Sequence, residues 1–196
     1  SEIMDIRKPV PTIYGYFHEK YGAFWAEQMT TLSSHAAIEK IFMPVESPVD
    51  MPTVFVKKSN AHEFLKELKE TYHYSFLTDY TATDEQGDEA GVIADSTARF
   101  HLVIHLMNVE NKARIRVKIR IQENETFPTL IPIWPGADWA EREIFDMFGI
   151  HFEGHPDLRR ILMDMRWEGH PLRKDYPLRG YQIFLTPEPL DPELLK

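Results

Sequence analysis

The chain has 196 residues, a formal net charge of −9 at pH 7 and no cysteine. Without thiolates, it can form no disulfide, no cysteine-ligated zinc site, no thiol redox centre and no iron–sulfur cluster held by its own cysteines. A content of 43% hydrophobic and 27% charged residues is ordinary for one globular domain. The negative charge argues against nucleic acid or anionic lipid as a partner.

The sequence predicts neither a membrane span nor a secretory signal. No apolar run approaches the ~18 residues of a membrane span. The first residues, SEIMDIRKPVPT, do not show the basic-then-apolar pattern of a secretory signal. We therefore expect a protein of a reducing compartment that does not itself cross a bilayer.

The first half of the chain predicts two helices and a strand. Residues 12–31 place apolar side chains at helical spacing, although two glycines interrupt the pattern, and predict a helix. Residues 53–57 (TVFVK) have the composition of a short strand. Asn60, followed three positions later by Glu63, is a capping signature that predicts the start of the next helix.

A β-hairpin is the clearest local pattern. After a segment of strand composition at 75–83, residues 100–106 and 114–121 each alternate apolar and polar side chains around the turn 108–112. Period two places the apolar side chains of both arms on one face and His, Arg and Lys on the other. We expect one face to pack against helices, and the basic face to be solvated or covered by a partner rather than to follow a phosphate backbone.

A further helix is predicted to begin at Asp138. Asp138 with Glu141 forms a capping box, Arg142 and Asp146 have the spacing of an i,i+4 ion pair, and Gly149 is a typical helix stop. The expected inner face consists of Ala140, Ile144, Met147 and Phe148.

Proline is distributed unevenly and marks the domain organisation. Five of the 14 prolines precede residue 53, none lies in 53–127, and nine follow. Because proline breaks helices and central strands, the regular core should lie in the middle of the chain. We predict an α+β fold, a small, largely antiparallel sheet with helices on one face, over residues 35–150. An N-terminal helical or extended segment (1–34) precedes it, and an extended, proline-rich docking segment and tail (151–196) follows.

Few catalytic patterns are present. There is no glycine-rich phosphate loop, nucleophile elbow or HExxH motif. His151, His155 and His170 could ligate a metal, which would suit a small hydrolase, but prolines after two of them favour histidines in turns that donate to backbone carbonyls. Glu141, Glu143 and Asp146 could serve as paired carboxylates in acid–base chemistry. Their place on a capped helix with Arg142 favours a structural, salt-bridged role.

The sequence GHPDLRR at 154–160 nearly repeats as GHPLRKD at 169–175, with Trp167 between the two copies. Gly-His-Pro favours a turn, and the following arginines present planar donors that suit fixed carboxylates. Arginine and tryptophan are also enriched at interface hot spots. These residues indicate a rigid segment that docks on another protein.

Residues 141–162 (EREIFDMFGIHFEGHPDLRRIL) and 167–178 (WEGHPLRKDYPL) resemble the 30-kDa, or C-type, subunit family of NADH–quinone oxidoreductase, respiratory complex I. The match includes the Glu-Arg-Glu triplet at 141–143, Asp146, His155, Arg159, Ile161 and Leu162 at the family spacing. The resemblance covers about residues 35–180. The wider family includes relatives in membrane-bound hydrogenases and other dehydrogenase complexes. The chain resembles the unfused form rather than the form joined to the D-type subunit.

The resemblance implies a structural subunit of the peripheral arm that supports electron transfer from NADH to quinone, coupled to proton translocation. It implies no catalytic centre and no cofactor in this chain, with FMN and iron–sulfur clusters in partner subunits. The implied partners are the quinone-site subunit (D or 49-kDa type) and the terminal-cluster subunit (B type), on the cytoplasmic side of a bacterial inner membrane or the matrix side in mitochondria. An equivalent scaffold of a hydrogenase or a non-NADH dehydrogenase is the alternative.

The same resemblance assigns structural or subunit-interface roles to eleven residues. Four would hold the junction between helix and turn: Glu141, Arg142, Glu143 and Asp146. The docking segment would contribute His155, Arg159, Arg160, Arg173, Lys174, Asp175 and Tyr176. From the repeated turns themselves, we expect Trp167 and His170 to join this interface.

Overall fold

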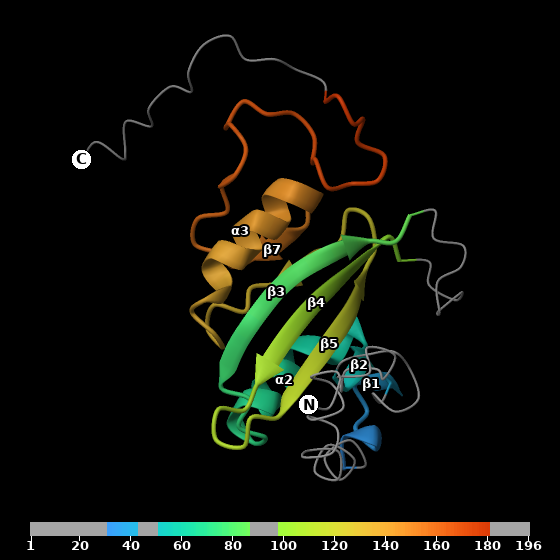
Figure 1. Cartoon of the computed structure of the whole chain (residues 1–196), viewed down its shortest axis with the longest axis vertical. Coiled ribbons are helices and arrows are strands. Elements are labelled where there is room, and N and C mark those ends of the chain that lie inside the picture. Colours follow the sequence, from blue (N-terminus) through green and yellow to red (C-terminus); the bar gives the residue numbers. More distant parts are fainter. Residues whose placement is uncertain (1–30, 43–50, 87–97, 181–196) are drawn as a thin grey trace, which may run out of the picture.

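The computed structural model describes residues 31–42, 51–86 and 98–180 (Figure 1). A five-stranded sheet has the order β1-β2-β5-β4-β3. Its strands are β1 (Ile38–Phe42), β2 (Thr53–Val56), β3 (Phe76–Asp84), β4 (Phe100–Met107) and β5 (Arg114–Ile121). Only the β2–β5 pairing is parallel; the other three are antiparallel. The helix predicted over 12–31 lies outside the described residues except for its last position.

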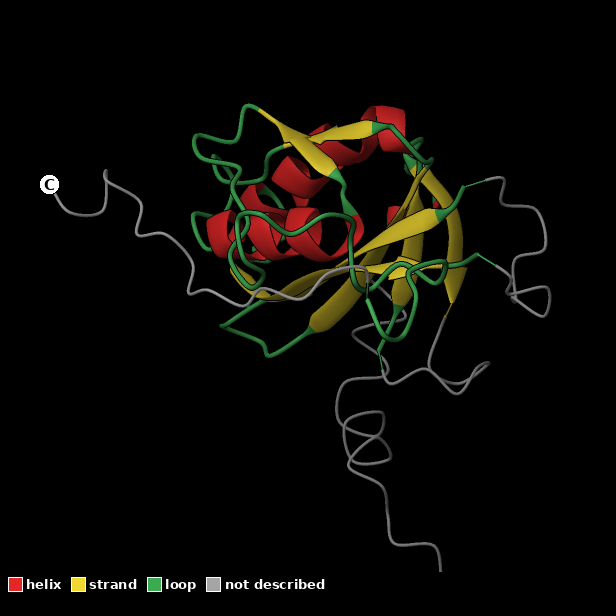
Figure 2. Ribbon diagram, turned by 90° about the horizontal axis from the view of Figure 1, so that it is seen from above, coloured by secondary structure: helices red, strands yellow, loops and turns green. Residues whose placement is uncertain are grey.

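Two helices accompany the sheet, α2 (Lys58–Glu70) and α3 (Ala137–Phe148). Both lie on the same side of the sheet, which Figure 2 shows from above. A small parallel pair, β6 (Thr126–Pro128) and β7 (His151–Glu153), flanks α3. The predicted α+β class, with a largely antiparallel sheet and helices on one face, is confirmed.

The hairpin forms as its periodicity predicts. Phe100 pairs with Ile121, and the apolar residues of β4 continue opposite those of β5, so one face of the hairpin is apolar throughout. Asn108 begins the turn, where its side-chain oxygen accepts the backbone N–H groups of Glu110 and Asn111 at 3.0 and 3.3 Å. Such an Asx turn explains how asparagine terminates β4.

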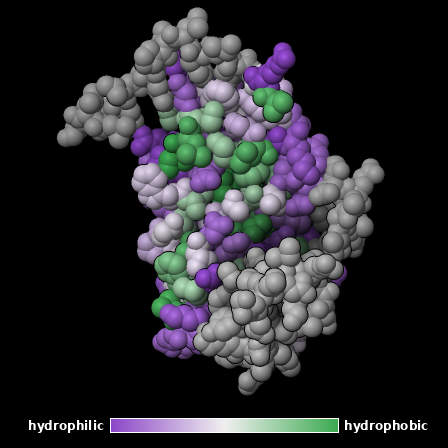
Figure 3. Space-filling model, viewed as in Figure 1, coloured by the Kyte–Doolittle hydropathy of each residue, from purple (hydrophilic) through white to green (hydrophobic). Residues whose placement is uncertain are grey.

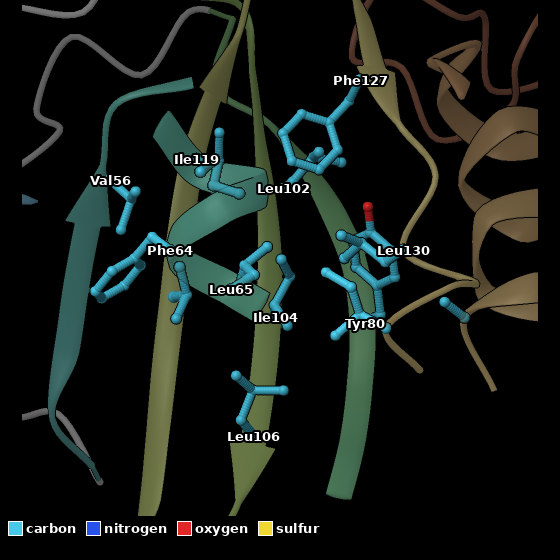
Figure 4. Packing of buried hydrophobic residues seen from close by; sticks show 14 of the residues in the cluster. Val56, Phe64, Leu65, Tyr80, Leu102, Ile104, Leu106, Ile119, Phe127 and Leu130 are labelled. Atoms are coloured by element: carbon cyan, nitrogen blue, oxygen red, sulfur yellow. The ribbon is translucent and has the colours of Figure 1, made fainter. Parts of the chain in front are cut away.

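The core lies between this apolar face and α2. Figure 4 shows Leu65 of α2 beside Ile104 of β4, and the ring of Phe64 on the side of Val56 in β2. All four are at most 1% exposed. Each such side chain contributes about 1.5–3 kcal/mol through burial, so the hairpin and α2 stabilise each other rather than folding independently.

Both predicted helix caps are wrong. α2 begins at Lys58, two residues before Asn60, and its N-cap Lys57 makes no side-chain cap bond. α3 begins after Gly136, which has no side chain to cap the helix, and the carboxylate of the predicted capping partner Glu141 lies in the protein interior. The predicted C-terminal stop is correct, since Gly149 has φ +76°. The short strands β1, β6 and β7 were not predicted.

Strand β3 is an edge strand, and α3 lies beside it. Residues 154–180, coloured orange to red in Figure 1, contain turns but neither helix nor strand, and pass over α3 and the ends of β3, β4 and β5. The proline-rich residues beyond 180 lie outside the described part. No helix within the described ranges is long and apolar enough to span a membrane.

Candidate functional site

Asp146 holds the turn-rich segment 154–180 onto α3. It is completely buried, and its Oδ2 accepts the backbone N–H groups of Ile161, Leu162 and Met163 at 3.0, 2.8 and 2.9 Å. Its Oδ1 accepts a hydrogen bond from Arg160 Nη1 at 2.5 Å. Burial alone would raise the pKa of Asp146, but these four donors outweigh burial and lower the pKa below its ordinary value.

Arg160 connects the two Gly-His-Pro turns. Besides its bond to the Asp146 carboxylate, its Nη2 donates to the carbonyl of Gly169 at 2.8 Å. Arg142 does not pair with Asp146 as its spacing predicts; it donates instead to the carbonyls of Arg159 and Arg160 at 3.2 and 3.3 Å. The repeated motif is therefore one structural unit, closed by arginine bonds that the repeat alone did not reveal.

The C-terminus of α3 is capped by the second turn. A helix leaves its last four carbonyls without intrahelical partners. Here the Phe145 carbonyl accepts Gly149 N–H at 2.8 Å, and the next three accept groups from residues 170–173. His170 Nδ1 donates to Asp146 at 3.0 Å, Leu172 N–H to Met147 at 3.1 Å, and Arg173 Nε to Phe148 at 2.6 Å. The Arg173 guanidinium also suits the negative end of the helix dipole.

A second set of charges attaches the same segment to the sheet. Arg99, 11% exposed, contacts Asp175 at 2.7 Å, Glu123 at 2.8 Å and Asp84 at 3.2 Å. Lys174 N–H donates to Asp84 at 2.9 Å, and Arg173 contacts Glu123 at 3.2 Å. Burial would raise the pKa of Asp84, but the Lys174 and Gln86 amides and Arg99 lower it.

Sequence reasoning missed three members of this set, Asp84, Arg99 and Glu123. They stand at the ends of β3, β4 and β5, which are far apart in sequence. Because Asp84 and Phe100 are register partners, the antiparallel pairing of β3 with β4 places Arg99 beside Asp84. The alternation of the hairpin could have predicted their common edge, but not that Asp175 would reach it.

The first turn is fixed by a buried carboxylate and a histidine. Glu141 accepts hydrogen bonds from Thr129 Oγ1 and Leu130 N–H, both at 2.6 Å. The His155 side chain is fully buried; its Nε2 donates to the Asp138 carbonyl at 3.2 Å, and its Nδ1 accepts Asp157 N–H at 3.1 Å. Burial raises the pKa of Glu141 despite these two donors.

The three candidate metal histidines do not converge. His155 and His170 bond to backbone carbonyls, as the non-metal interpretation predicts, and the ring of exposed His151 packs on Phe145 at 5.0 Å. Among the described residues, no three His, Cys, Asp or Glu side chains are grouped to hold a metal ion. The metal-dependent hydrolase therefore lacks the ligand set proposed for it.

The remaining predicted site residues lie at or near the surface. Glu143 is exposed on α3, and Arg159 pairs with Asp157 at 2.7 Å. Trp167 and Tyr176 are half-buried and approach Gly180. Whether these residues contact a partner stays a prediction, since the structure contains this chain alone.

Large apolar side chains are exposed on the fixed segment. Leu162, Met165, Leu172 and Leu178 are each at least 54% exposed, and the backbone N–H groups of Leu162 and Leu172 donate to buried Asp146 and to the Met147 carbonyl. Exposed apolar residues on a rigid support are typical of protein–protein interfaces. The fold and the site together define a class: an α+β protein in which buried charges hold a turn-rich segment against a helix and the end of the sheet.

Comparison with known proteins places the chain within this class. Residues 54–182 match the model of the family described as respiratory-chain NADH dehydrogenase, 30 Kd subunit, and the chain belongs to that family. The C-type subunit of the NADH-quinone oxidoreductase of Citrifermentans bemidjiense is 50% identical over 129 residues, which cover 65% of this chain and 75% of that protein.

Two solved structures share the fold. One is a trypsin-resistant fragment of Nqo5, with a TM-score of 0.58 and 24% identity over 68% of this chain and 99% of the fragment. The other is a chain of the membrane-bound sulfane sulfur reductase, an archaeal respiratory membrane complex, with a TM-score of 0.54 and 25% identity over 80% of this chain and 86% of that one.

Replacing Gly149 tests the close approach of the second turn. A Cβ at Gly149 would lie 2.5 Å from His170 Nε2 and 2.7 Å from Arg173 Nη2, at a φ of +76°. We expect Gly149→Ala to lower the free energy of unfolding by roughly 1–3 kcal/mol in urea denaturation. Gly136→Ala is the control, because its φ is −65° and its Cβ meets nothing within 4 Å. Equal effects of the two substitutions would contradict the assigned packing.

Asp146→Asn tests the central carboxylate. An amide cannot accept from three backbone N–H groups and also balance the charge of Arg160. We expect the substitution to lower the free energy of unfolding by about 2–5 kcal/mol at pH 7, measured by urea denaturation. Asp157→Asn, which alters an exposed pair, should cost less than about 1 kcal/mol. A loss at Asp146 no larger than at Asp157 would show that Asp146 does not anchor the segment.

The opposite pKa directions of Asp146 and Glu141 predict opposite pH dependences. Because folding lowers the pKa of Asp146, its carboxylate stabilises the fold at pH values above the pKa in the unfolded chain, near 4. This contribution disappears as pH falls through the pKa in the folded protein. Folding raises the pKa of Glu141, so its contribution to stability grows as pH falls towards about 4.5. The free energy of unfolding of Glu141→Gln should therefore rise relative to that of wild type as pH rises from about 4.5. That of Asp146→Asn should approach the wild-type value as pH falls below about 4. Denaturation at a series of pH values measures both, and slopes of the same sign would contradict the assignment.

Proposed function

We propose that this chain is the C-type structural subunit of the peripheral arm of an NADH–quinone oxidoreductase. The family match over residues 54–182 carries the proposal, because it includes both Gly-His-Pro turns and the α3 residues that hold them. The 50% identical relative bears that subunit's name. In this role the chain supports electron transfer from NADH to quinone, coupled to proton translocation, by holding other subunits in place.

The proposed subunit carries no redox group. The absence of cysteine removes the usual ligands of iron–sulfur clusters, and the charges of the site are used in internal bonds. FMN and the clusters would then belong to partner subunits. The proposed partners are the D-type quinone-site subunit and the B-type terminal-cluster subunit, with the assembly attached to the cytoplasmic face of a bacterial inner membrane, or to the matrix face in mitochondria.

A second candidate is the equivalent scaffold of a complex that does not oxidise NADH. The similarity to a chain of the sulfane sulfur reductase, over 80% of this chain, supports this candidate. The two candidates share the scaffold role and differ in the electron donor. A flavin-bearing NADH-oxidising module that co-purifies with this chain would support the first candidate; its absence from an intact complex would support the second.

Deletion and tagging test the proposal. A tagged copy purified from detergent-solubilised membranes of its source organism should recover the D-type and B-type subunits, FMN and NADH:quinone reductase activity. Deleting the gene should abolish both assembly and activity, because a subunit that spans its neighbours has no substitute, and a plasmid copy should restore them. A complex that remains intact and active without this chain would disprove the structural role.

A further inference from the structure

A groove of about 610 Å³ lies between the edge strand β3 and helix α3. Leu77 and Asp79 form one wall, Trp139 and Glu143 form the other, and Leu162 of the turn-rich segment borders it. Gly136, at the N-terminus of α3, opens it at one end. The groove thus combines residues from three parts of the chain that the tertiary structure brings together.

Two large apolar side chains of this groove, those of Trp139 and Leu162, are exposed. Trp139 is 66% and Leu162 60% exposed, whereas the other faces of α3 bury Ile144 and Phe148. Figure 3 shows hydrophobic residues gathered around α3 on this side of the molecule, bordered by hydrophilic ones. An apolar patch with a polar rim marks an interaction site rather than free surface.

Both exposed anchors are held in place from below. The Arg142 guanidinium lies 5.6 Å from the Trp139 ring and is itself bonded to two carbonyls. The backbone of Leu162 donates directly to buried Asp146. A partner that binds here would lose little of its affinity to ordering these residues, which is the property of a hot spot.

The rim of the groove is acidic. Within the described part of the chain, Glu143 makes no hydrogen bond or ion pair. The Asp79 side chain is 57% exposed, and its carboxylate lies 3.5 Å from His105 Nδ1. Arg142, whose guanidinium lies against the Trp139 ring, donates its hydrogen bonds to backbone carbonyls. The charge here therefore complements a cation.

We propose that this groove seats a segment of a partner subunit that inserts a large apolar side chain between Trp139 and Leu162. Lysine or arginine next to that side chain in the partner pairs with Glu143 and Asp79. The inference rests on the proposed function and adds to it the contact surface and the chemistry of the segment that fits it.

Photo-crosslinking identifies the occupant. The photoreactive amino acid benzoylphenylalanine replaces Trp139 in the full chain, in cells that make the whole complex. The expected product joins this chain to a different subunit, at a peptide with a large apolar residue within a few positions of Lys or Arg. A crosslink to a second copy of this chain, a crosslink to an acidic peptide, or none in a complex that assembles would overturn the proposal.

Filling the groove tests its contribution without disturbing the fold. Gly136→Trp places a bulky side chain at a position with φ −65° and no atom within 4 Å of a Cβ. Glu110→Trp, in the exposed β4–β5 turn, is the matched control. We expect Gly136→Trp to lower co-purification with partner subunits by roughly tenfold or more, with an unchanged melting temperature for the chain alone, and Glu110→Trp to have no effect.

Reversing the charge of Glu143 tests the proposed pairing with a lysine or arginine of the partner. Glu143→Lys should reduce recovery of the complex more than Glu143→Gln, and the difference should shrink as salt rises, because exposed charges are screened. If wild type assembles and all groove variants assemble equally well, the groove proposal fails and the subunit assignment stands. If wild type itself assembles with no other subunit, the proposed function fails and the groove proposal fails with it.

Discussion

The rest of the site depends on the ionised carboxylate of Asp146, which is fully buried at the C-terminal end of α3. An isolated buried charge is costly, so the fold must surround it with donors. It does so with three consecutive peptide N–H groups, 161–163, and one guanidinium, that of Arg160. Satisfying this charge ties residues 160–163 to the end of α3 and so constrains the path of the chain that follows.

The end of α3 imposes the complementary constraint. Its terminal carbonyls need donors just as the Asp146 carboxylate does, and residues 170–173 supply them. Gly149 makes this possible, because a side chain there would occupy the space of His170 and Arg173. The segment 154–180, which has neither helix nor strand, is thus held by the preceding helix α3. Arg99 and Asp84 attach its residues 174 and 175 to the sheet.

This arrangement separates the buried charges of the segment from its exposed apolar side chains. Glu141 and Asp146 of the signature are buried, and Asp146 with Arg160 orders the segment, whereas Glu143 and the apolar Leu162 and Leu172 remain exposed. The bonds that hold the segment come from this chain itself. The buried charges of the family's motif therefore fix the path of this segment.

The sequence by itself determined the elements with local patterns: the hairpin from its period of two, α2 and α3 from their apolar spacing, and the end of α3 at Gly149. It also indicated that the repeated turns belong together. Only the tertiary structure decided the partners, since Arg142 bonds to carbonyls rather than to Asp146, and Glu141 turns inward rather than capping α3. The physical reason is the distance along the chain over which each kind of interaction acts. Periodicity and turn chemistry act within a few residues, whereas a buried charge is satisfied by whichever donors the packed sheet and helices bring to it, from as far along the chain as Asp84 and Lys174.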